Sequence, residues 1–492
     1  MKPRDILLKT LTAACGLGLF GASSEAQSAP VIGIYYSTMH CTDSADTGLP
    51  IYDISKILAG IGTWGPEFKT HWWGRPDQGY YCLSRDDVTL KKHAEQLRDA
   101  GIDFVYLDIT NHPDLNSDIN AQGLHTRSSA PEEMIKKPLD RMLAVWSTVT
   151  NAPKIVPWVQ VVEDTPTVFP YKGDMIDHIR MKMTGSSLAY PVNNKPVVLV
   201  SPRDGVYANN KIASLAPTLT VFRMWVGAQG DWSFMSHCSN DSDFKSKRGN
   251  VDCGQQASSD GNQIAVSAAY QSNWMSNTAS AIPKFHGMTF LRQMETAWRS
   301  GRQVVTINGW NEWTSMRLKV NAPGIYVSDY AFTDQYDKEY SRDLEPGGGA
   351  GDQYYQLMKR AIAELDAGRN PMNAGGSFGT IRGVIDGVVN NSVNGWACSY
   401  GSSLSVDVHL YVGGSAGSGT VIGGYGSDNV SEIQVAQACG SIGKAYRFSI
   451  PLSTATRRAH AGKKIYIHGI HPTGAYSNAL ISNSGVFAVP AP

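Results

Sequence analysis

Carboxylate, amide and indole side chains meet in one short segment of this chain, Val304–Trp313 (VVTINGWNEW). Its first half is apolar and β-branched, which predicts a buried strand. Trp310, Asn311, Glu312 and Trp313 follow directly. In a parallel α/β barrel, the side chains at the carboxyl end of a strand form the active site. A carboxylate beside aromatic faces suits a sugar ring, which has apolar C–H faces and a rim of hydroxyl groups.

Further carboxylates follow other apolar, strand-like segments, namely Asp108, Glu163 and Asp164. Glycoside hydrolysis uses two carboxyl groups on either side of one bond, in different protonation states. We expect Glu312 to be the general acid, because partial burial raises the pKa of a carboxyl group. Asp108 is then the base or nucleophile, with Glu163 or Asp164 as the alternative. The competing interpretation of these acids is a salt bridge or a helix cap.

Aromatic and polar side chains at strand ends, and in the loop Trp64–Cys82, complete the predicted site. The loop aromatics form either a platform that stacks on sugars or a small core beneath a long loop. Arg342 either pairs with an acidic neighbour or reaches Glu312. No HExxH or similar spacing is present, so we expect no metal and no cofactor. The residues expected to bind substrate are Tyr36, His71, Trp72, Trp73, Asn111, Trp158, Trp225, Trp310, Asn311 and Trp313.

Strand-like and helix-like segments alternate between residues 30 and 368, which predicts a parallel sheet. Their number favours a (β/α)8 barrel, with the eighth strand hidden in Asp53–Lys69. No GxGxxG follows a strand, which argues against a nucleotide-binding sheet. The seven clear strands are expected at Val31–Tyr36, Ile102–Leu107, Lys154–Val162, Pro196–Val200, Leu219–Val226, Gln263–Ala268 and Gln303–Ile307.

The rest of the chain predicts three further parts. Residues 1–29 have basic residues before a short apolar run, which is typical of a secretory signal peptide. Residues 369–380 have the composition of a linker, and residues 381–492 show the short alternating strands of a β-sandwich accessory domain. We expect a secreted or periplasmic protein. Cys15 lies in an imperfect lipobox, so a lipoprotein is the alternative; the apolar run is too short to span a bilayer.

Six cysteines remain once the signal peptide is removed, and an even number in an exported chain predicts disulfides. Fifteen pairings exist, and we favour bonds between sequence neighbours. No CxxC spacing occurs, which argues against zinc. The expected bonds are Cys41–Cys82, Cys238–Cys253 and Cys398–Cys439.

The overall charge narrows the range of partners. The chain has 43 Lys and Arg against 43 Asp and Glu, and no long basic run. Nucleic acids and anionic membrane surfaces are therefore poor candidates. We expect a polysaccharide or oligosaccharide substrate, no membrane span and a monomer.

Three motifs resemble those of secreted barrel hydrolases of the glycoside hydrolase family 99 kind, which includes endo-α-mannosidase relatives and WbsX-like proteins. They are HWWG at His71–Gly74, YLDITN at Tyr106–Asn111 and GWNEW at Gly309–Trp313. The resemblance implies a (β/α)8 barrel over residues 31–368 and two catalytic glutamates, one in NEW and one three residues later. Glu312 matches the first, but Ser315 occupies the second position. The missing carboxylate would come from Asp108, Glu163 or Asp164.

These observations together predict an exported glycoside hydrolase that cleaves a polysaccharide internally. The alternative is a non-catalytic glycan-binding protein on a hydrolase-like barrel, and Ser315 in place of a carboxylate supports it. Release of reducing ends from polysaccharides distinguishes the enzyme from the binding protein.

Overall fold

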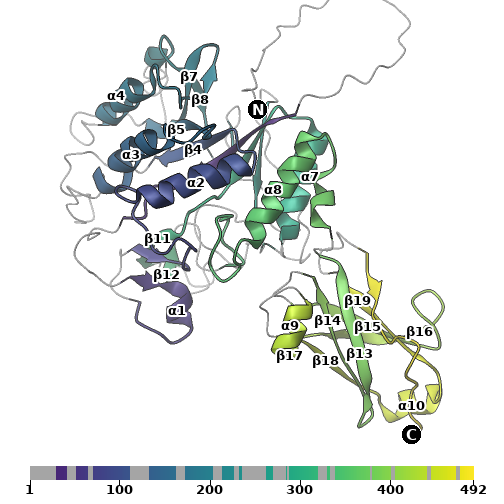
Figure 1. Cartoon of the computed structure of the whole chain (residues 1–492). Helices are drawn as coiled ribbons and strands as arrows, with labels where there is room; N and C mark the ends of the chain where they lie inside the picture. Colours follow the sequence, from purple (N-terminus) through teal and green to yellow (C-terminus); the bar gives the residue numbers. More distant parts are fainter. Residues whose placement is uncertain are drawn as a thin grey trace, which may run out of the picture.

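The computed structural model is shown in Figure 1. It describes residues 29–41, 51–64, 70–110, 132–161, 172–202, 213–225, 232–234, 262–269, 284, 287–319, 330–332, 338–376, 379–400, 405–439, 445–471 and 477–492. None of the helices in these ranges combines the length and hydropathy that crossing a bilayer requires. The predicted signal peptide lies almost wholly outside the described residues.

A mostly parallel central sheet organises the first 370 residues, so the predicted α/β class is confirmed. Seven strands pair in parallel in the order β9-β10-β1-β4-β5-β7-β8, and the short β6 (Pro191–Val192) pairs antiparallel with β7. These seven correspond to the seven strands predicted from the sequence. They are β1 (Val31–Tyr36), β4 (Phe104–Ile109), β5 (Lys154–Val161), β7 (Lys195–Pro202), β8 (Thr220–Arg223), β9 (Gln263–Ser267) and β10 (Val304–Asn308).

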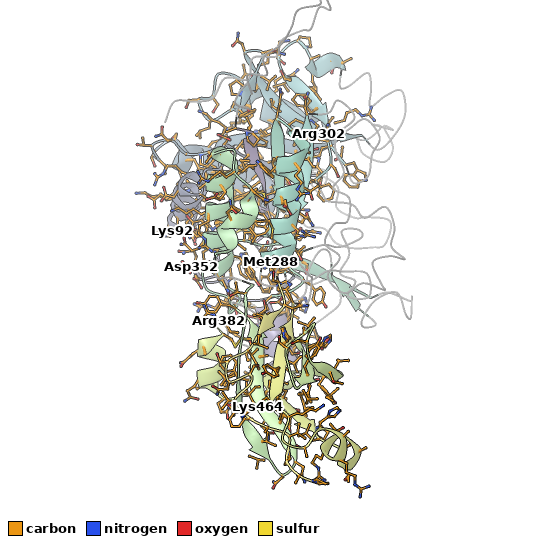
Figure 2. All side chains as sticks on the ribbon, turned by 90° about the vertical axis from the view of Figure 1, so that its right-hand side faces the viewer. Lys92, Met288, Arg302, Asp352, Arg382 and Lys464 are labelled. Carbon is orange, nitrogen blue, oxygen red and sulfur yellow. A yellow bond between two sulfur atoms is a disulfide. The ribbon has the colours of Figure 1, made fainter. Side chains whose placement is uncertain are left out.

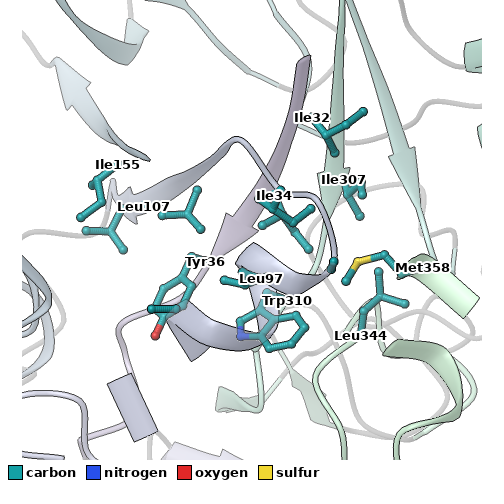
Figure 3. Close-up of a cluster of buried hydrophobic side chains, with 14 of the residues drawn as sticks. Ile32, Ile34, Tyr36, Leu97, Leu107, Ile155, Ile307, Trp310, Leu344 and Met358 are labelled. Carbon is teal, nitrogen blue, oxygen red and sulfur yellow. The ribbon is translucent and has the colours of Figure 1, made fainter. Parts of the chain in front are cut away.

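Helices cover one face of this sheet, and the alternation of each strand decides which side chains meet them. On β1, Ile32, Ile34 and Tyr36 belong to the large core that the strands share with the helices. Figure 3 shows these three with Trp310 in that core. The helices are α2 (Asp87–Asp99), α3 (Lys137–Trp146), preceded by the π-helical turn η1 (Glu132–Lys136), α4 (Lys172–Met183), α7 (Met288–Ser300) and α8 (Gln353–Asp366).

The opposite face of the sheet holds a second apolar cluster, which contains Val31 and Tyr35 of β1 and Trp158 of β5. Trp232 and Phe234 also belong to it, and Trp232 forms a parallel bridge with Met224 just after β8. The side chain of Gln263 on β9 then bonds both the N–H and the C=O of Ser233, at 3.1 and 2.8 Å. Residues 232–234 therefore occupy the position between β8 and β9.

The prediction of an eighth strand within Asp53–Lys69 is wrong for the residues that the structure describes there. Tyr52–Asp53 is β2 and Ile54–Leu58 is α1, which the Asp53 side chain caps. β2 belongs to a separate small sheet in the order β12-β11-β3-β2, formed with β3 (Thr70–Trp72), β11 (Thr314–Lys319) and β12 (Tyr330–Phe332). This small sheet continues directly from the end of β10.

The C-terminal part is all-β, as predicted, with two four-stranded antiparallel sheets and two short helices. Side chains from both sheets form one apolar core. This part is yellow-green in Figure 1, and Arg382 and Lys464 mark it in Figure 2. Its elements are β13 (Ile381–Val389), β14 (Ser392–Ser399), β15 (Asp407–Val412), β16 (Thr420–Gly426), β17 (Asn429–Val430), α9 (Ile433–Ala438), β18 (Ala445–Pro451), α10 (Thr454–His460), β19 (Ile465–Ile470) and β20 (Ala479–Leu480).

The predicted linker, residues 369–380, contains the 3-10 helix η3 (Pro371–Gly375). Ala374 in this helix is buried in the core beneath α7 and α8, and its carbonyl accepts a bond from Arg360 at 3.0 Å. The chain is thus anchored to the first part before it enters the sandwich. The exact domain limits stay a prediction.

Two of the three predicted disulfides are confirmed. Cys41–Cys82 and Cys398–Cys439 have Cα atoms 4.6 and 6.1 Å apart. The first joins the end of β1 to the long loop before α2, and the second joins β14 to the end of α9. Cys238 and Cys253 lie outside the described residues.

Candidate active site

Two predicted catalytic carboxylates, Asp108 and Glu312, meet on a single tyrosine. The hydroxyl of Tyr35 lies 3.0 Å from Oδ2 of Asp108 and 3.2 Å from Oε1 of Glu312. Because both contacts share one oxygen, the two carboxylate oxygens are at most about 6.2 Å apart. All three side chains are at least nine-tenths buried, at the carboxyl ends of β1, β4 and β10. Parallel strands bring them together because their carboxyl ends meet on one edge of the sheet.

Strand alternation explains why Tyr35 was missed and why Tyr36 is wrong as a substrate-binding residue. Successive side chains of a strand point to opposite faces. Tyr35 lies on the face of the sheet opposite the helices, together with the two carboxylates. Tyr36 lies in the helix-side core, where its hydroxyl contacts Nδ1 of His93 at 2.7 Å and its ring packs edge-on to Trp146. The phase of the alternation, read from Ile32 and Ile34, is the signal that could have identified Tyr35.

Asp108 is held by the residue that follows β4. Its Oδ1 accepts bonds from the backbone N–H of Thr110 at 2.8 Å and from the Thr110 hydroxyl at 2.6 Å. Its Oδ2 faces Tyr35. The Asp108 carboxyl group is therefore fixed in place, with one oxygen directed to the tyrosine.

Glu312 has a cationic partner, which the sequence left as one of two alternatives. Nη2 of Arg342 lies 3.3 Å from Oε2 of Glu312, and the guanidinium is almost fully buried. The backbone N–H of Glu312 donates to Oδ1 of Asp343 at 2.5 Å. Arg342 therefore reaches Glu312, and its charge favours the ionised form of that carboxylate.

The loop aromatics are buried rather than exposed as a sugar platform, and they belong to the large core that the strands share with the helices. Trp72, Trp73 and Tyr81 are buried, at 2, 3 and 4% exposure. Trp73 stacks on Trp313, with ring centroids 4.4 Å apart and planes 14° apart. Such rings have little free surface for a sugar. The prediction that Trp72 and Trp73 bind substrate is therefore replaced by a supporting role beneath the site.

Three more of the residues predicted to bind substrate form hydrogen bonds or ring contacts within the protein instead. His71 is fully buried, and its Nε2 lies 2.6 Å from the carbonyl of Trp64. The side-chain amide of Asn311 accepts from the N–H of Ser37 at 2.8 Å and donates to its carbonyl at 3.1 Å. Trp310 is fully buried between α2 and α8, against His93 and Tyr355. These residues support the carboxyl ends of β1 and β10 from behind.

Among the described aromatic residues that were predicted to bind substrate, Trp225 is partly exposed and the others are buried. Its ring centroid lies 6.2 Å from that of buried Trp158 and 5.8 Å from that of Phe234. It follows β8, on the same edge of the sheet as Asp108. Asn111, Glu163 and Asp164 lie outside the described residues, so their predicted roles stay predictions.

His40 supports the end of β10 in its neutral form. Its Nε2–H donates to the carbonyl of Asn311 at 2.6 Å. Complete burial lowers the pKa of His40 to about 3. The imidazole therefore carries no charge at the pH at which carboxylates act, and its role is to hold the backbone next to Glu312.

Within the described ranges, no group of three or more His, Cys, Asp or Glu side chains has the arrangement of a metal site. The chemistry available there is that of the two carboxyl groups, Tyr35 and Arg342. Two carboxyl groups that share a tyrosine hydroxyl can transfer protons, and an ionised carboxylate can stabilise a developing positive charge.

No model of a protein family matches this chain, and no curated protein matches it. Among solved structures, it is similar to a glycoside hydrolase family 99 endo-α-mannosidase from Bacteroides thetaiotaomicron, with 12% identity, a TM-score of 0.41 and 69% of this chain and 98% of that one covered. A second structure of that enzyme gives 14% identity and a TM-score of 0.39 over the same shares. CldA, a cyclomaltodextrin glucanotransferase, gives 10% identity and a TM-score of 0.33, with 86% and 99% covered. The family 99 enzymes that the motifs resemble are therefore among the similar structures.

Proposed function

We propose that this protein is a glycoside hydrolase that cleaves a polysaccharide internally with Asp108 and Glu312 as its carboxyl pair. The single observation that carries the proposal is the Tyr35 hydroxyl within hydrogen-bonding distance of both groups. A phenol has one proton to donate, so it satisfies both contacts best when one carboxyl is protonated and the other ionised. One acid and one carboxylate is the state that glycoside hydrolysis needs.

The separation of the pair supports a retaining reaction. Carboxyl groups lie about 5–5.5 Å apart in retaining glycosidases and about 6.5–9.5 Å apart in inverting ones. The nearest oxygens of Asp108 and Glu312 are at most about 6.2 Å apart, and the Tyr35 hydroxyl occupies the space between them where an inverting enzyme would hold its water. A direct attack by one carboxylate on the sugar carbon is therefore the favoured first step.

Arg342 supports a different division of roles from the one predicted from the sequence. That prediction made Glu312 the acid because of an apolar environment. The buried guanidinium beside it favours the ionised form instead. In the proposed reaction Glu312 attacks the sugar carbon while Asp108 protonates the leaving oxygen. Asp108 then takes a proton from the water that releases the sugar from Glu312.

Ser315, which stands where family 99 has its second glutamate, leaves that task to another residue. It lies in β11 opposite His71 and is 5% exposed. It can neither donate the proton nor act as the base in place of a carboxyl group. Serine at this position also supports the alternative function, a glycan-binding protein without catalysis. Hydrolysis assays distinguish the two functions.

The proposal includes the finer features predicted from the sequence. The sheet closes into a (β/α)8 barrel through residues 232–234, supported by the bonds between Gln263 and Ser233. Trp225 stacks on a sugar beside the pair. The protein is exported, and the two disulfides are compatible with an oxidising compartment.

The test is hydrolysis of a polysaccharide panel by the wild type and by Glu312→Gln and Asp108→Asn. We expect new reducing ends from at least one polymer, and a loss of about 10²–10⁴-fold in rate for each variant, while glycan binding persists. Glu364→Gln is the matched control, because this glutamate pairs with Arg369 on the surface of α8.

Azide separates the roles of the two carboxyl groups. Added to Glu312→Gln, it replaces the missing nucleophile and yields a glycosyl azide of inverted configuration. Added to Asp108→Asn, it attacks the enzyme-bound sugar and yields a retained azide. Exchanged outcomes would reverse the roles. If the wild type binds a polymer and cleaves none, the binding function replaces the hydrolase.

A further inference from the structure

The segment Ser341–Glu345 fastens the turn that presents Glu312. This turn begins at Gly309, whose φ of +112° favours glycine. The backbone of Arg342 packs so closely that a Cβ on Gly309 would lie 2.2 Å from the Arg342 carbonyl oxygen. The N–H groups of Leu344 and Glu345 donate to the Trp310 carbonyl at 3.1 and 2.9 Å. Two distant parts of the chain are thereby joined along their backbones.

Asp343 lies at the centre of this contact. Its Oδ1 accepts the backbone N–H of Glu312 at 2.5 Å, and its Oδ2 accepts the indole N–H of Trp73 at 2.7 Å. Trp73 stacks on Trp313, and its backbone N–H donates to the Trp313 carbonyl at 3.0 Å. One carboxylate therefore holds Glu312 and the indole pair that follows it.

We propose that Asp343 is a positioning residue for the proposed hydrolase, because it fixes the backbone of Glu312 at the place where that carboxylate meets Tyr35 and Asp108. Both Asp343 oxygens bind N–H groups, and the side chain is 2% exposed. It therefore acts through Glu312 and does not touch substrate. Misplacement of a reacting group by about 1 Å costs about 100-fold in rate.

Because Asp343 is ionisable, its effect on Glu312 should depend on pH. A side chain that only fills space would not produce such a dependence. Burial raises the pKa of Asp343 to about 7, while the Lys284 ammonium and the two N–H bonds oppose this shift. Lys284 contacts the Asp343 backbone carbonyl at 2.9 Å, and Glu345 is the negative group nearby that adds to the shift. Protonation places a hydrogen on one of the two accepting oxygens. The anchor is thus complete above pH 7 and weakened as the pH falls through 7.

The kinetic test compares wild type with Asp343→Asn on a polymer that the wild type cleaves. An asparagine has one oxygen that accepts, so one of the two N–H bonds is lost. We expect kcat to fall about 10–100-fold with KM nearly unchanged. The wild type should lose kcat as the pH falls through about 7, and Asp343→Asn should lack that limb. Glu364→Gln is the control.

The spectroscopic test needs no substrate and uses protein labelled with ¹⁵N-tryptophan. The indole N–H resonance of Trp73, identified by its loss in Trp73→Phe, should shift with pH near 7 and lose that shift in Asp343→Asn. The Trp298 indole, which donates to the backbone carbonyl of Gly368 at 3.1 Å, is the internal reference. If Asp343→Asn does not fold, the wild type alone still provides a test. The pH at which its Trp73 indole resonance shifts and the pH at which its kcat falls must then agree within one pH unit.

These arms separate the proposal from the proposed function on which it rests. A wild type that hydrolyses no polymer overturns the function, and the change of the Trp73 indole resonance in Asp343→Asn then decides whether Asp343 holds the turn. An active wild type with unchanged kcat and pH profile in Asp343→Asn overturns the positioning role and leaves the hydrolase intact. A Trp73 indole resonance that is the same in Asp343→Asn as in the wild type also overturns the proposal.

Discussion

The carboxyl ends of β1, β4 and β10 and the core of the sandwich are built on opposite principles. Around Tyr35 the protein buries carboxylates, a guanidinium and histidines, each held by hydrogen bonds. In the described part of residues 381–492, no Asp, Glu, Lys or Arg side chain is fully buried, and the core is aliphatic apart from Phe448. Burying charge costs free energy unless partners offset it, whereas burying aliphatic side chains stabilises directly.

The two regions therefore differ in what their buried side chains contribute to stability. The sandwich core consists of residues such as Ile465 and Ile467, which are fully buried between two sheets. The end of the parallel sheet contains Asn308, a fully buried residue whose amide nitrogen and oxygen have no hydrogen-bond partner among the described residues. An unsatisfied buried amide lowers stability, and such groups are characteristic of functional sites.

Truncation of Ile467 to alanine should have the largest effect on stability. Removal of a buried isoleucine side chain costs about 2–5 kcal/mol, because apolar burial is lost and a cavity remains. We expect the sandwich to unfold at lower denaturant concentration while hydrolysis by the first part is unchanged, as measured by chemical denaturation and by reducing-end release. A loss of hydrolysis at temperatures where the first part stays folded would show that the two regions are coupled.

The same truncation at Asn308 should have a smaller effect of opposite sign. Asn308→Ala removes two buried polar atoms that lack partners, and the relief of about 1–3 kcal/mol outweighs the small cavity. We expect the midpoint of unfolding of the first part to rise. A fall comparable to that of Ile467→Ala would mean that Asn308 is satisfied in solution and that the contrast between the regions is smaller than proposed.

The sequence predicted the elements well, because strands and helices follow local periodicity. The seven strands, the all-β C-terminal part and two neighbour disulfides needed only patterns within short windows. The eighth strand expected within Asp53–Lys69 is wrong for the described residues, which form β2 and α1 there. Tyr35 and Tyr36 are both aromatic, so residue type alone does not show which of them faces the site. Only the alternation of side chains along β1 distinguishes them.

The hydrogen bonds and ion pairs within the site could not be predicted from local sequence patterns. Arg342 and Glu312 are 30 residues apart, and Asp343 and Trp73 are 270 apart. Neither spacing carries a periodic signal, since a loop of any length can close such a contact. The sequence left the partner of Arg342 open between an acidic neighbour and Glu312 for the same reason, although Glu312 itself was found from its place after a buried strand.

The stereochemistry of cleavage depends on how Asp108, Glu312 and Tyr35 are arranged. Proton NMR of the first products, before the free sugars mutarotate, reports the configuration of the anomeric carbon that is released. A pair of carboxyl groups bridged by Tyr35, with nearest oxygens at most about 6.2 Å apart, predicts retention of the configuration that the polymer had. Inversion would show that this assignment is wrong, because it requires a water in the space that the Tyr35 hydroxyl occupies between Asp108 and Glu312.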